Sequence, residues 1–293
     1  MKITCFGEVL WDVFPDQRKV GGAPLNVALR LKSMGVSSSI LTKIGDDEYG
    51  KAIKTYIKNS ALPVHTIQID NKYKTGEVHV SLDDVHTATY TIDTPSAWDF
   101  IQCSEELVAE VKQSDAIIFG SLASRNAVSR NTLFKLLKEA KFRILDINLR
   151  PPHYTSQLLS DIMQKADFIK LNDEELEEVG SLLKIKEDLV EDQIRAIADV
   201  TGTFQICVTK GKNGAMLFFD GKFYYNAGYP IKVIDTVGAG DSFLATLIST
   251  LLQNETPQKS LDYACAVGAM VAGSEGANPV FTFDEVKKFM LDS

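Results

Sequence analysis

The sequence lacks the features that mark secreted, membrane-spanning and nucleic-acid-binding proteins. Its 293 residues hold only four cysteines (Cys5, Cys103, Cys207 and Cys265), and their wide spacing matches neither a zinc site nor a redox motif. No apolar run approaches the ~18 residues that span a bilayer, and an acidic residue at position 8 comes too early for a signal peptide. The 31 Lys and Arg against 39 Asp and Glu give a net charge of −8, which disfavours nucleic acid and anionic membrane surfaces as partners. We therefore expect a cytoplasmic protein with reduced thiols, no nucleic-acid partner and no membrane association.

What the sequence does contain is a regular alternation of short apolar runs and helical patterns. Strands are predicted at residues 3–6, 39–44, 115–119, 143–147, 167–171 and 205–209. Helices are predicted at residues 26–34, 48–58, 105–112, 131–140, 155–165 and 174–183. Several of the apolar runs are nearly continuous, as is typical of strands buried on both faces of a parallel sheet. The alternation predicts one α/β domain over residues 1–293, with a mainly parallel central sheet.

Residues 64–93 break this alternation because they show no helical period. Val78, Val80 and Leu82 alternate with polar residues, and residues 89–92 alternate in the same way. This pattern predicts a small antiparallel sheet with one wet face, separate from the main sheet. Two interpretations stay open: a lid that closes over a site and excludes water, or a hairpin with no such role.

The most informative stretch is a glycine turn late in the chain. Ile231, Val233 and Ile234 predict a strand that leads into Gly238-Ala239-Gly240 and then directly into a helix. Small residues let the backbone approach a ligand closely, and successive N–H groups at a helix N-terminus form an anion site. Neither the P-loop pattern nor a G-x-G-x-x-G following a strand occurs in the chain.

Asp241 follows this turn, where a carboxylate would repel a bound phosphate. One interpretation makes Asp241 the N-cap of the helix. The other makes it a general base, which takes a proton from an attacking hydroxyl while the backbone N–H groups stabilise the transferred phosphoryl group.

Two signatures at opposite ends of the chain resemble those of the ribokinase-like (PfkB) carbohydrate kinases. The C-terminal one reads Asp235-Thr236-Val237-Gly238-Ala239-Gly240-Asp241, and the N-terminal one reads Gly21-Gly22-Ala23-Pro24-Leu25-Asn26-Val27-Ala28. The resemblance covers essentially the whole chain. It implies a three-layer α/β/α body with a small β-sheet lid, formed by about residues 64–99 and the segment near 12–20. It also implies ATP-dependent phosphorylation of a hydroxymethyl group on a small sugar, with Mg²⁺.

The resemblance also implies roles for single residues around the sugar. Asp241 matches the catalytic base, and the anion hole for the γ-phosphoryl group matches Gly238, Ala239 and Gly240. The residues that match sugar contacts, or stand beside them, are Asp12, Gly21, Gly22, Asn26, Trp98 and Arg150. Taken alone, Asp12 is also typical of a turn, Asn26 of an N-cap, and Arg150 of a structural ion pair.

A second group of residues matches the nucleotide and metal site of the same family. Asn172 and Glu175 match an N-x-x-E element in which Glu175 holds Mg²⁺ through water. Thr209, Gly211 and Gly214 match a loop along the nucleotide, and Asn278 lies in the turn expected beside the adenine. Without the family, the acidic run would be a helix N-terminus and the loop a plain hairpin turn.

The resemblance extends to a monovalent cation and to assembly. Asp235 matches a candidate K⁺ ligand, although Val280 stands where some relatives carry a serine ligand. The lid makes a candidate homodimer interface, because lids in this family often pair.

Three short segments resemble fructokinases more than other members of the family: Ala23-Pro24, residues 75–80 and Ala97-Trp98-Asp99. Residues 64–99 offer few basic side chains for a phosphosugar. We therefore predict that fructose and ATP give fructose 6-phosphate. Ribose, 2-keto-3-deoxygluconate and an inactive nucleotide- or sugar-binding sensor stay open as alternatives. A dinucleotide-dependent oxidoreductase would need a glycine fingerprint that the chain lacks.

Overall fold

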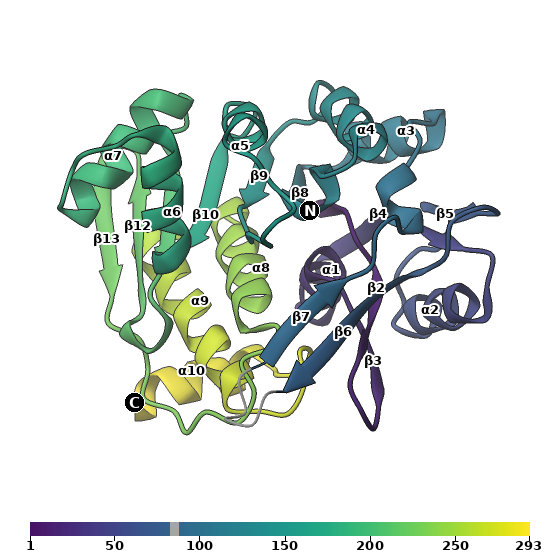
Figure 1. Cartoon of the computed structure of the whole chain (residues 1–293). Helices are drawn as coiled ribbons and strands as arrows, with labels where there is room; N and C mark the ends of the chain where they lie inside the picture. The colour runs from purple at the N-terminus through teal and green to yellow at the C-terminus, as the bar shows by residue number, and fades with distance from the viewer. Residues whose placement is uncertain (83–87) are drawn as a thin grey trace.

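The computed structural model describes residues 1–82 and 88–293, and its main feature is a long, mostly parallel sheet (Figure 1). The strands of this sheet lie in the order β13 (Lys222–Asn226), β12 (Ala215–Phe219), β11 (Ile206–Thr209), β10 (Phe168–Asn172), β9 (Arg143–Asp146), β8 (Ala116–Gly120), β1 (Lys2–Phe6), β4 (Ser37–Gly45) and β5 (Ile67–Asp70). From β11 to β5 all neighbours are parallel, whereas β12 and β13 form an antiparallel hairpin extension. The six strands predicted between residues 3 and 209 are present, with ends that differ by at most two residues.

Helices cover both faces of this sheet because successive strand residues point to opposite sides. Ile118 packs in the core on the face covered by α1 (Ala23–Ser33), α2 (Glu48–Asn59), α8 (Ala239–Leu252) and α9 (Pro257–Ala272). Its neighbour Ile117 packs on the face covered by α3 (Glu105–Gln113), α4 (Ala127–Leu137), α5 (Ser156–Met163), α6 (Asp173–Leu183) and α7 (Val190–Thr201). The last helix, α10 (Phe283–Asp292), packs against α9. The three-layer α/β/α architecture is therefore confirmed.

The glycine turn opens α8, as predicted, but its surroundings differ from the prediction in two ways. Residues 227–237 form no strand, because the N–H groups of Ile234 and Asp235 donate to the carbonyl of Ala272 at the end of α9. In addition, α8 is buried on all sides from Ser242 to Thr250, rather than along one face, because it lies between α1 and α9.

A second, small sheet stands apart from the main one. It is built from β3 (Arg18–Gly21), β2 (Leu10–Val13), β6 (Gly76–Leu82) and β7 (Ala88–Ile92), in that order. The sheet is mixed rather than purely antiparallel, because β2 and β6 run parallel. Within the segment expected to build this sheet, β5 instead joins the main sheet, and residues 83–87 lie outside the described residues.

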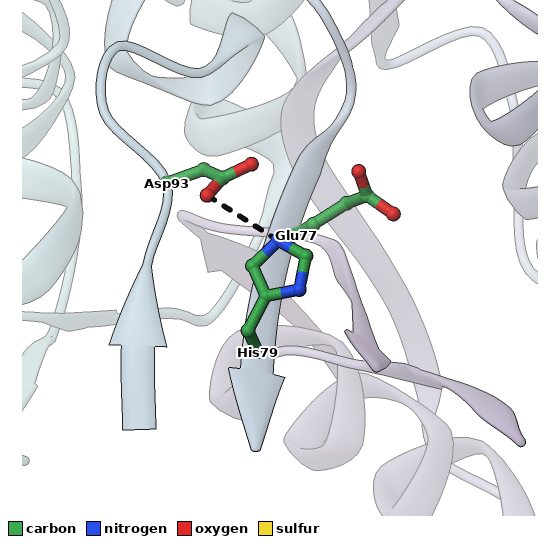
Figure 2. Close-up of side chains that lie close together, drawn as sticks. All are labelled: Glu77, His79 and Asp93. Carbon is green, nitrogen blue, oxygen red and sulfur yellow. Dashed lines mark ion pairs between the residues drawn. The ribbon is translucent and has the colours of Figure 1, made fainter. Parts of the chain in front are cut away.

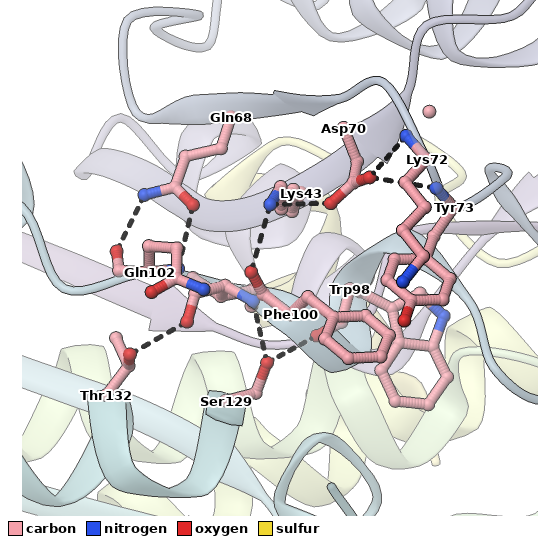
Figure 3. A network of polar contacts seen from close by, with 12 residues as sticks. Lys43, Gln68, Asp70, Lys72, Tyr73, Trp98, Phe100, Gln102, Ser129 and Thr132 are labelled. Atoms are coloured by element: carbon pink, nitrogen blue, oxygen red, sulfur yellow. Dashed lines mark hydrogen bonds and ion pairs between the residues drawn. The ribbon is translucent and has the colours of Figure 1, made fainter. Parts of the chain in front are cut away.

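The chain returning from the small sheet is fastened to the body by a polar network (Figure 3). This return segment contains the 3₁₀ turn η1 (Ala97–Phe100) and continues to Gln102. Lys43 donates to the carbonyl of Phe100 (3.1 Å), and Gln68 exchanges two hydrogen bonds with the backbone of Gln102 (2.7 and 2.9 Å). From α4, Ser129 accepts from the N–H of Ile101 (2.9 Å). Backbone groups on both sides of the segment are thus satisfied, so the base of the small sheet is fixed.

Within the described residues, no helix has the length and apolar character needed to cross a membrane.

Candidate active site

The order of strands in the main sheet reverses direction between β1 and β8. From β1 the chain builds outward to β4 and β5, and from β8 it builds the other way to β9, β10 and β11. In open α/β sheets, ligands bind outside the carboxyl ends of the strands at such a switch point. Asn172 and Thr209 end β10 and β11 at this edge, and Arg150 and Glu8 lie in the segments that follow β9 and β1.

Asp241 lies in the first turn of α8, and its side chain contacts Asn26 instead of capping the helix. The N-cap of α8 is Gly238, which has left-handed backbone angles, so the interpretation of Asp241 as an N-cap is wrong. Its Oδ2 accepts a hydrogen bond from Nδ2 of Asn26 (2.8 Å). Burial raises the pKa of Asp241 to about 6; nearby Asp146 adds to the rise, and the Asn26 hydrogen bond opposes it. A carboxylate with this pKa is ionised at neutral pH and can accept a proton.

Asn26 is the centre of a chain of polar contacts. Helix α1 begins at Ala23 with Gly22 as N-cap, so the prediction that a helix starts at Asn26, and the interpretation of Asn26 as an N-cap, are wrong. While its amide nitrogen donates to Asp241, its Oδ1 accepts from Nδ2 of Asn278 (3.0 Å). Asn278, which was expected beside the adenine, therefore contacts the N-terminal signature through Asn26. The side chain of Asn26 thus joins α1 to α8 through Asp241 and to the C-terminal turn through Asn278.

The glycine turn is packed against a second loop near the C-terminus. Gly238 has φ +76°, and a Cβ at this position would come within 2.6 Å of the carbonyl oxygen of Ala277. Asp235 ties the same two segments together, since its carboxylate accepts from the N–H groups of Val237 (3.0 Å) and Gly276 (3.3 Å). The tight approach explains why a side chain is absent at position 238.

A buried ion pair lies beneath this turn. Lys170 of β10 stands directly opposite Asp146 of β9, and its Nζ donates to Oδ1 of Asp146 (3.0 Å). A Cβ on Gly240 would lie 3.4 Å from this ammonium group. Burial by itself would lower the pKa of Lys170, but Asp146 and Glu175 outweigh burial and raise it. The ion pair therefore fixes an ammonium group beneath the turn, and Asp146 balances its charge.

The sequence-based reasoning missed Lys170. A lysine within an otherwise apolar, buried strand is the signal that could have revealed it, because lysine is almost never fully buried unless it is paired.

Two acidic residues, Asp12 and Glu8, lie beside the paired glycines Gly21 and Gly22. Asp12 lies on β2 of the small sheet, so its interpretation as a turn residue is wrong, and its Oδ2 would be 2.1 Å from a Cβ at Gly21. Burial raises the pKa of Asp12 to about 6, while Arg150 and Lys19 oppose the rise. A side chain at Gly21 would therefore clash with Asp12, which gives this glycine a steric reason.

Glu8 is a further buried carboxylate that the sequence-based reasoning did not select. Its carbonyl oxygen would be 2.4 Å from a Cβ at Gly22, and its Oε2 is buried with no hydrogen-bond partner among the described residues. Burial raises the pKa of Glu8 to about 7, and Arg150 opposes the rise. The signal that could have found it is its place directly after the first buried strand.

Arg150 and Trp98 differ in their access to a ligand. Arg150 is exposed and donates to the carbonyl of Leu149 (2.8 Å). Its positive charge opposes the rise that burial causes in the pKa of Glu8, Asp12 and Asp241. Trp98 is wholly buried under the guanidinium of Arg125, 4.0 Å from its ring centre, so it does not fit a substrate contact.

The N-x-x-E element forms a helix cap. Asn172 is the N-cap of α6 and accepts from the N–H of Glu175 (2.7 Å), and Glu175 accepts in return from the N–H of Asn172 (2.9 Å). Glu175 also accepts from the N–H of Leu149 (2.8 Å) and is buried. The structural interpretation of this acidic helix start is therefore confirmed. Because a carboxylate has about four acceptor positions, Glu175 keeps acceptor capacity that suits water-mediated contact with Mg²⁺.

The other predicted nucleotide residues lie in the hairpin between β11 and β12, which contains the 3₁₀ turn η3 (Gly211–Asn213). Thr209 ends β11 at the same edge of the sheet as Asn172, its register partner on β10. Gly214 is closely packed against the chain that follows β13, whereas Gly211 has open space around it. For the K⁺ expectation, Val280 offers no side-chain oxygen, and it is exposed.

Comparison with known proteins identifies the family. The model for the pfkB family carbohydrate kinases matches residues 2–282. The chain belongs to this family. A fructokinase from Salmonella typhimurium is 28% identical over 299 residues, which cover 94% of each chain. Fructokinase-2 from Solanum lycopersicum is 29% identical over 308 residues, covering 94% of this chain and 92% of the relative.

Solved structures agree with the fold of this pfkB family member. Fructokinase from Xylella fastidiosa with bound ATP has a TM-score of 0.87 at 20% identity, over 99% of this chain and 98% of that one. Fructokinase from Vibrio cholerae O395, in a form with fructose, ADP and calcium ion, has a TM-score of 0.83 at 24% identity, over the same shares. The chain is a carbohydrate kinase, that is, a sugar phosphotransferase, with the ribokinase-like fold.

Proposed function

We propose that this kinase transfers the γ-phosphoryl group of ATP to the C6 hydroxyl of fructose. The observation that carries the proposal is the position of Asp241, which is held by Asn26 at the start of α8, directly after the glycine turn. Few arrangements place a proton acceptor and a row of backbone N–H groups so close together.

In the proposed reaction Asp241 accepts the proton of the attacking hydroxyl as the oxygen bonds to the γ-phosphorus. The bond from that phosphorus to the bridging oxygen breaks, and ADP leaves with the electron pair. The N–H groups of residues 238–240, with Lys170 beneath them, stabilise the charge on the phosphoryl oxygens. Asp12 and Asn26, beside the paired glycines, orient the sugar.

Mg²⁺, when bound through water near Asn172 and Glu175, neutralises part of the triphosphate charge. The net charge of −8 makes such local compensation necessary, since the chain as a whole repels an anionic nucleotide. Asp235 stays a predicted K⁺ ligand, and Val280 weighs against it.

Fructose is favoured over other sugars by the fructokinases among the curated relatives, at 28–29% identity. Two exposed cations lie beside the proposed sugar site: the charge of Arg150 acts on Glu8, Asp12 and Asp241, and the charge of Lys19 acts on Asp12. The three carboxylates offset these two positive charges, so the site favours a neutral sugar over a sugar acid or phosphosugar.

The test is a substrate panel with ATP and Mg²⁺. Fructose, ribose, 2-keto-3-deoxygluconate and a nucleoside are compared by ADP release, and the product is identified by ³¹P NMR. We expect the highest kcat/KM with fructose and phosphate on C6. An equal or higher kcat/KM on another sugar would overturn the substrate, and ATP binding without turnover on any sugar would favour the sensor.

The role of Asp241 is tested separately with Asp241→Asn. We expect kcat to fall by about 10²–10⁴-fold, the usual contribution of a general base. The matched control is Asp199→Asn on the exposed surface of α7, which should keep wild-type turnover. Near wild-type kcat in Asp241→Asn would exclude the proposed base. Homodimerisation through the small sheet and a cytoplasmic location stay predictions.

A further inference from the structure

Three potential metal ligands gather on the small sheet, away from the proposed active site (Figure 2). They are Glu77 and His79 of β6 and Asp93, which directly follows β7. One ligand atom from each lies within 4.8 Å of the other two. Nε2 of His79 and Oδ1 of Asp93 are 3.6 Å apart.

The backbone fixes this arrangement. Glu77 and His79 are two residues apart on one strand, so their side chains share a face of the sheet. The N–H of Asp93 donates to the carbonyl of Glu77 (3.0 Å), which sets the two carboxylates opposite each other across the strand pair. Facing carboxylates repel one another, and a cation between them removes that repulsion.

The pairing of β2 with β6 shows which face this is. Glu77 and His79 lie beside Trp11 and Val13 of β2, whereas Asp12 lies beside Val78. The three ligands therefore stand on the face opposite to Asp12. A metal ion there would contact neither sugar nor nucleotide in the proposed site.

One oxygen of Glu77 is already fixed. Oε1 of Glu77 accepts from Arg18 of β3 (2.7 Å), which leaves the second oxygen available and orients the carboxylate. His79 and Asp93 are about half exposed, so their side chains can adjust. In a tetrahedral site with bonds of about 2.0–2.2 Å, ligand atoms lie roughly 3.3–3.6 Å apart, a range that includes the 3.6 Å between His79 and Asp93.

We propose that Glu77, His79 and Asp93 bind a divalent transition-metal ion of the zinc type, with water in the remaining position. The imidazole selects such a metal over Mg²⁺ or Ca²⁺, which take oxygen ligands. The ion links β6 to the chain leaving β7. It therefore rigidifies the base of the small sheet, where Arg125 also holds the carbonyl of Asp93 (2.7 Å).

The experiment titrates nucleotide-free, reduced protein with Zn²⁺ in excess Mg²⁺, by calorimetry, and repeats it with Co²⁺ by absorption. We expect one site per chain, at least about tenfold weaker in His79→Ala and in Asp93→Asn. The matched control is His65→Ala. His65 is exposed and faces a single carboxylate, Glu110, at 3.7 Å, so this variant should bind as the wild type does.

Two further readouts separate the proposed site from other ligands. Cobalt bound here lacks thiolate charge-transfer bands, whereas capture by the partly exposed Cys103 would produce them. Zn²⁺ should raise the Tm of the wild type and His65→Ala, but not that of His79→Ala, and the three should melt alike in EDTA. No binding by the wild type, thiolate bands, or unchanged affinity in His79→Ala would overturn the proposal.

Discussion

Replacing Gly238 by alanine tests whether the glycine turn must keep its position. The φ of +76° costs an L-residue about 1–2 kcal/mol, wherever it occurs. At Gly238 the new Cβ would also meet the carbonyl oxygen of Ala277 at 2.6 Å. An ordinary contact begins near 3.4 Å, so the turn or its neighbour must move by about 0.8 Å.

A second glycine separates these two effects. Gly35 has φ +77°, is exposed at the end of α1, and has nothing within 4 Å of an added Cβ. Gly35→Ala therefore carries the backbone strain without the steric clash. For a chain of this size 1 kcal/mol corresponds to roughly 2 °C, so we expect its Tm to fall by about 2–4 °C and its kcat to be unchanged.

Gly238→Ala should lose at least as much stability and, in addition, activity. Misplacing a catalytic group by about 1 Å can cost on the order of 10²-fold in rate, and we expect kcat to fall by about 10–100-fold. The assays are thermal melts and steady-state kinetics with ATP and the best sugar of the panel. Equal kcat values for Gly238→Ala and Gly35→Ala would refute the view that the turn must be held in place for the reaction.

The remaining predictions concern the charged groups around Asp241. Because the pKa of Asp241 is raised to about 6 and the base must be ionised, kcat/KM should fall about tenfold per pH unit below pH 6. Asn26→Ala removes a hydrogen bond that favours the ionised form, so this acid limb should move up by about one pH unit. Since the pKa of Glu8 is raised to about 7, the folded protein favours the protonated form of this carboxyl, and the free energy of unfolding falls as pH rises from about 4.5 to 7. Relative to the wild type, Glu8→Gln should therefore be more stable at pH 8 than at pH 4.5 by up to about 3 kcal/mol. Lys170→Met leaves Asp146 buried without its partner, which should cost about 3–5 kcal/mol and lower kcat.

Each of these predictions has an outcome that contradicts it. A flat kcat/KM profile between pH 5 and 7 would show that no group with this pKa controls the reaction. An unmoved acid limb in Asn26→Ala, beside an unchanged one in the surface control Asn131→Ala, would mean that the hydrogen bond does not tune Asp241. A pH-independent difference in unfolding free energy for Glu8→Gln would show that this carboxyl has the same pKa folded and unfolded. Wild-type stability of Lys170→Met would show that Asp146 finds another partner.

The sequence predicted the main sheet well because strands buried on both faces are marked by nearly continuous apolar residues. The prediction failed at residues 231–235, where Ile231, Val233 and Ile234 are apolar but find no partner strand, and the chain bonds instead to the end of α9. The apolar pattern of α8 predicted one buried face, whereas all of its residues from Ser242 to Thr250 are buried. A helix enclosed by two others can bury small polar residues as well. The local pattern of apolar residues shows which secondary structures a segment can form, and its tertiary contacts decide which of them it adopts.

The same limit applies to the site. Asn26 and Asp241 are both suited to helix caps, and nothing nearby in sequence reveals that they bind each other across 215 residues. Asn172 and Glu175, by contrast, form the cap that their spacing predicts, because a capping box needs only four consecutive residues.

By itself, the sequence determined the family and with it the kinase chemistry, because the two glycine signatures at opposite ends of the chain are those of the pfkB carbohydrate kinases. Only the tertiary structure decided that Lys170 lies beneath the glycine turn and that Glu8 lies buried beside Gly22. Only it brought Glu77, His79 and Asp93 together on one face of the small sheet. The physical reason is that electrostatic interactions act through space. The pKa of a charged side chain and its partners depend on burial and on distances that the order of the strands sets, not on neighbours along the chain.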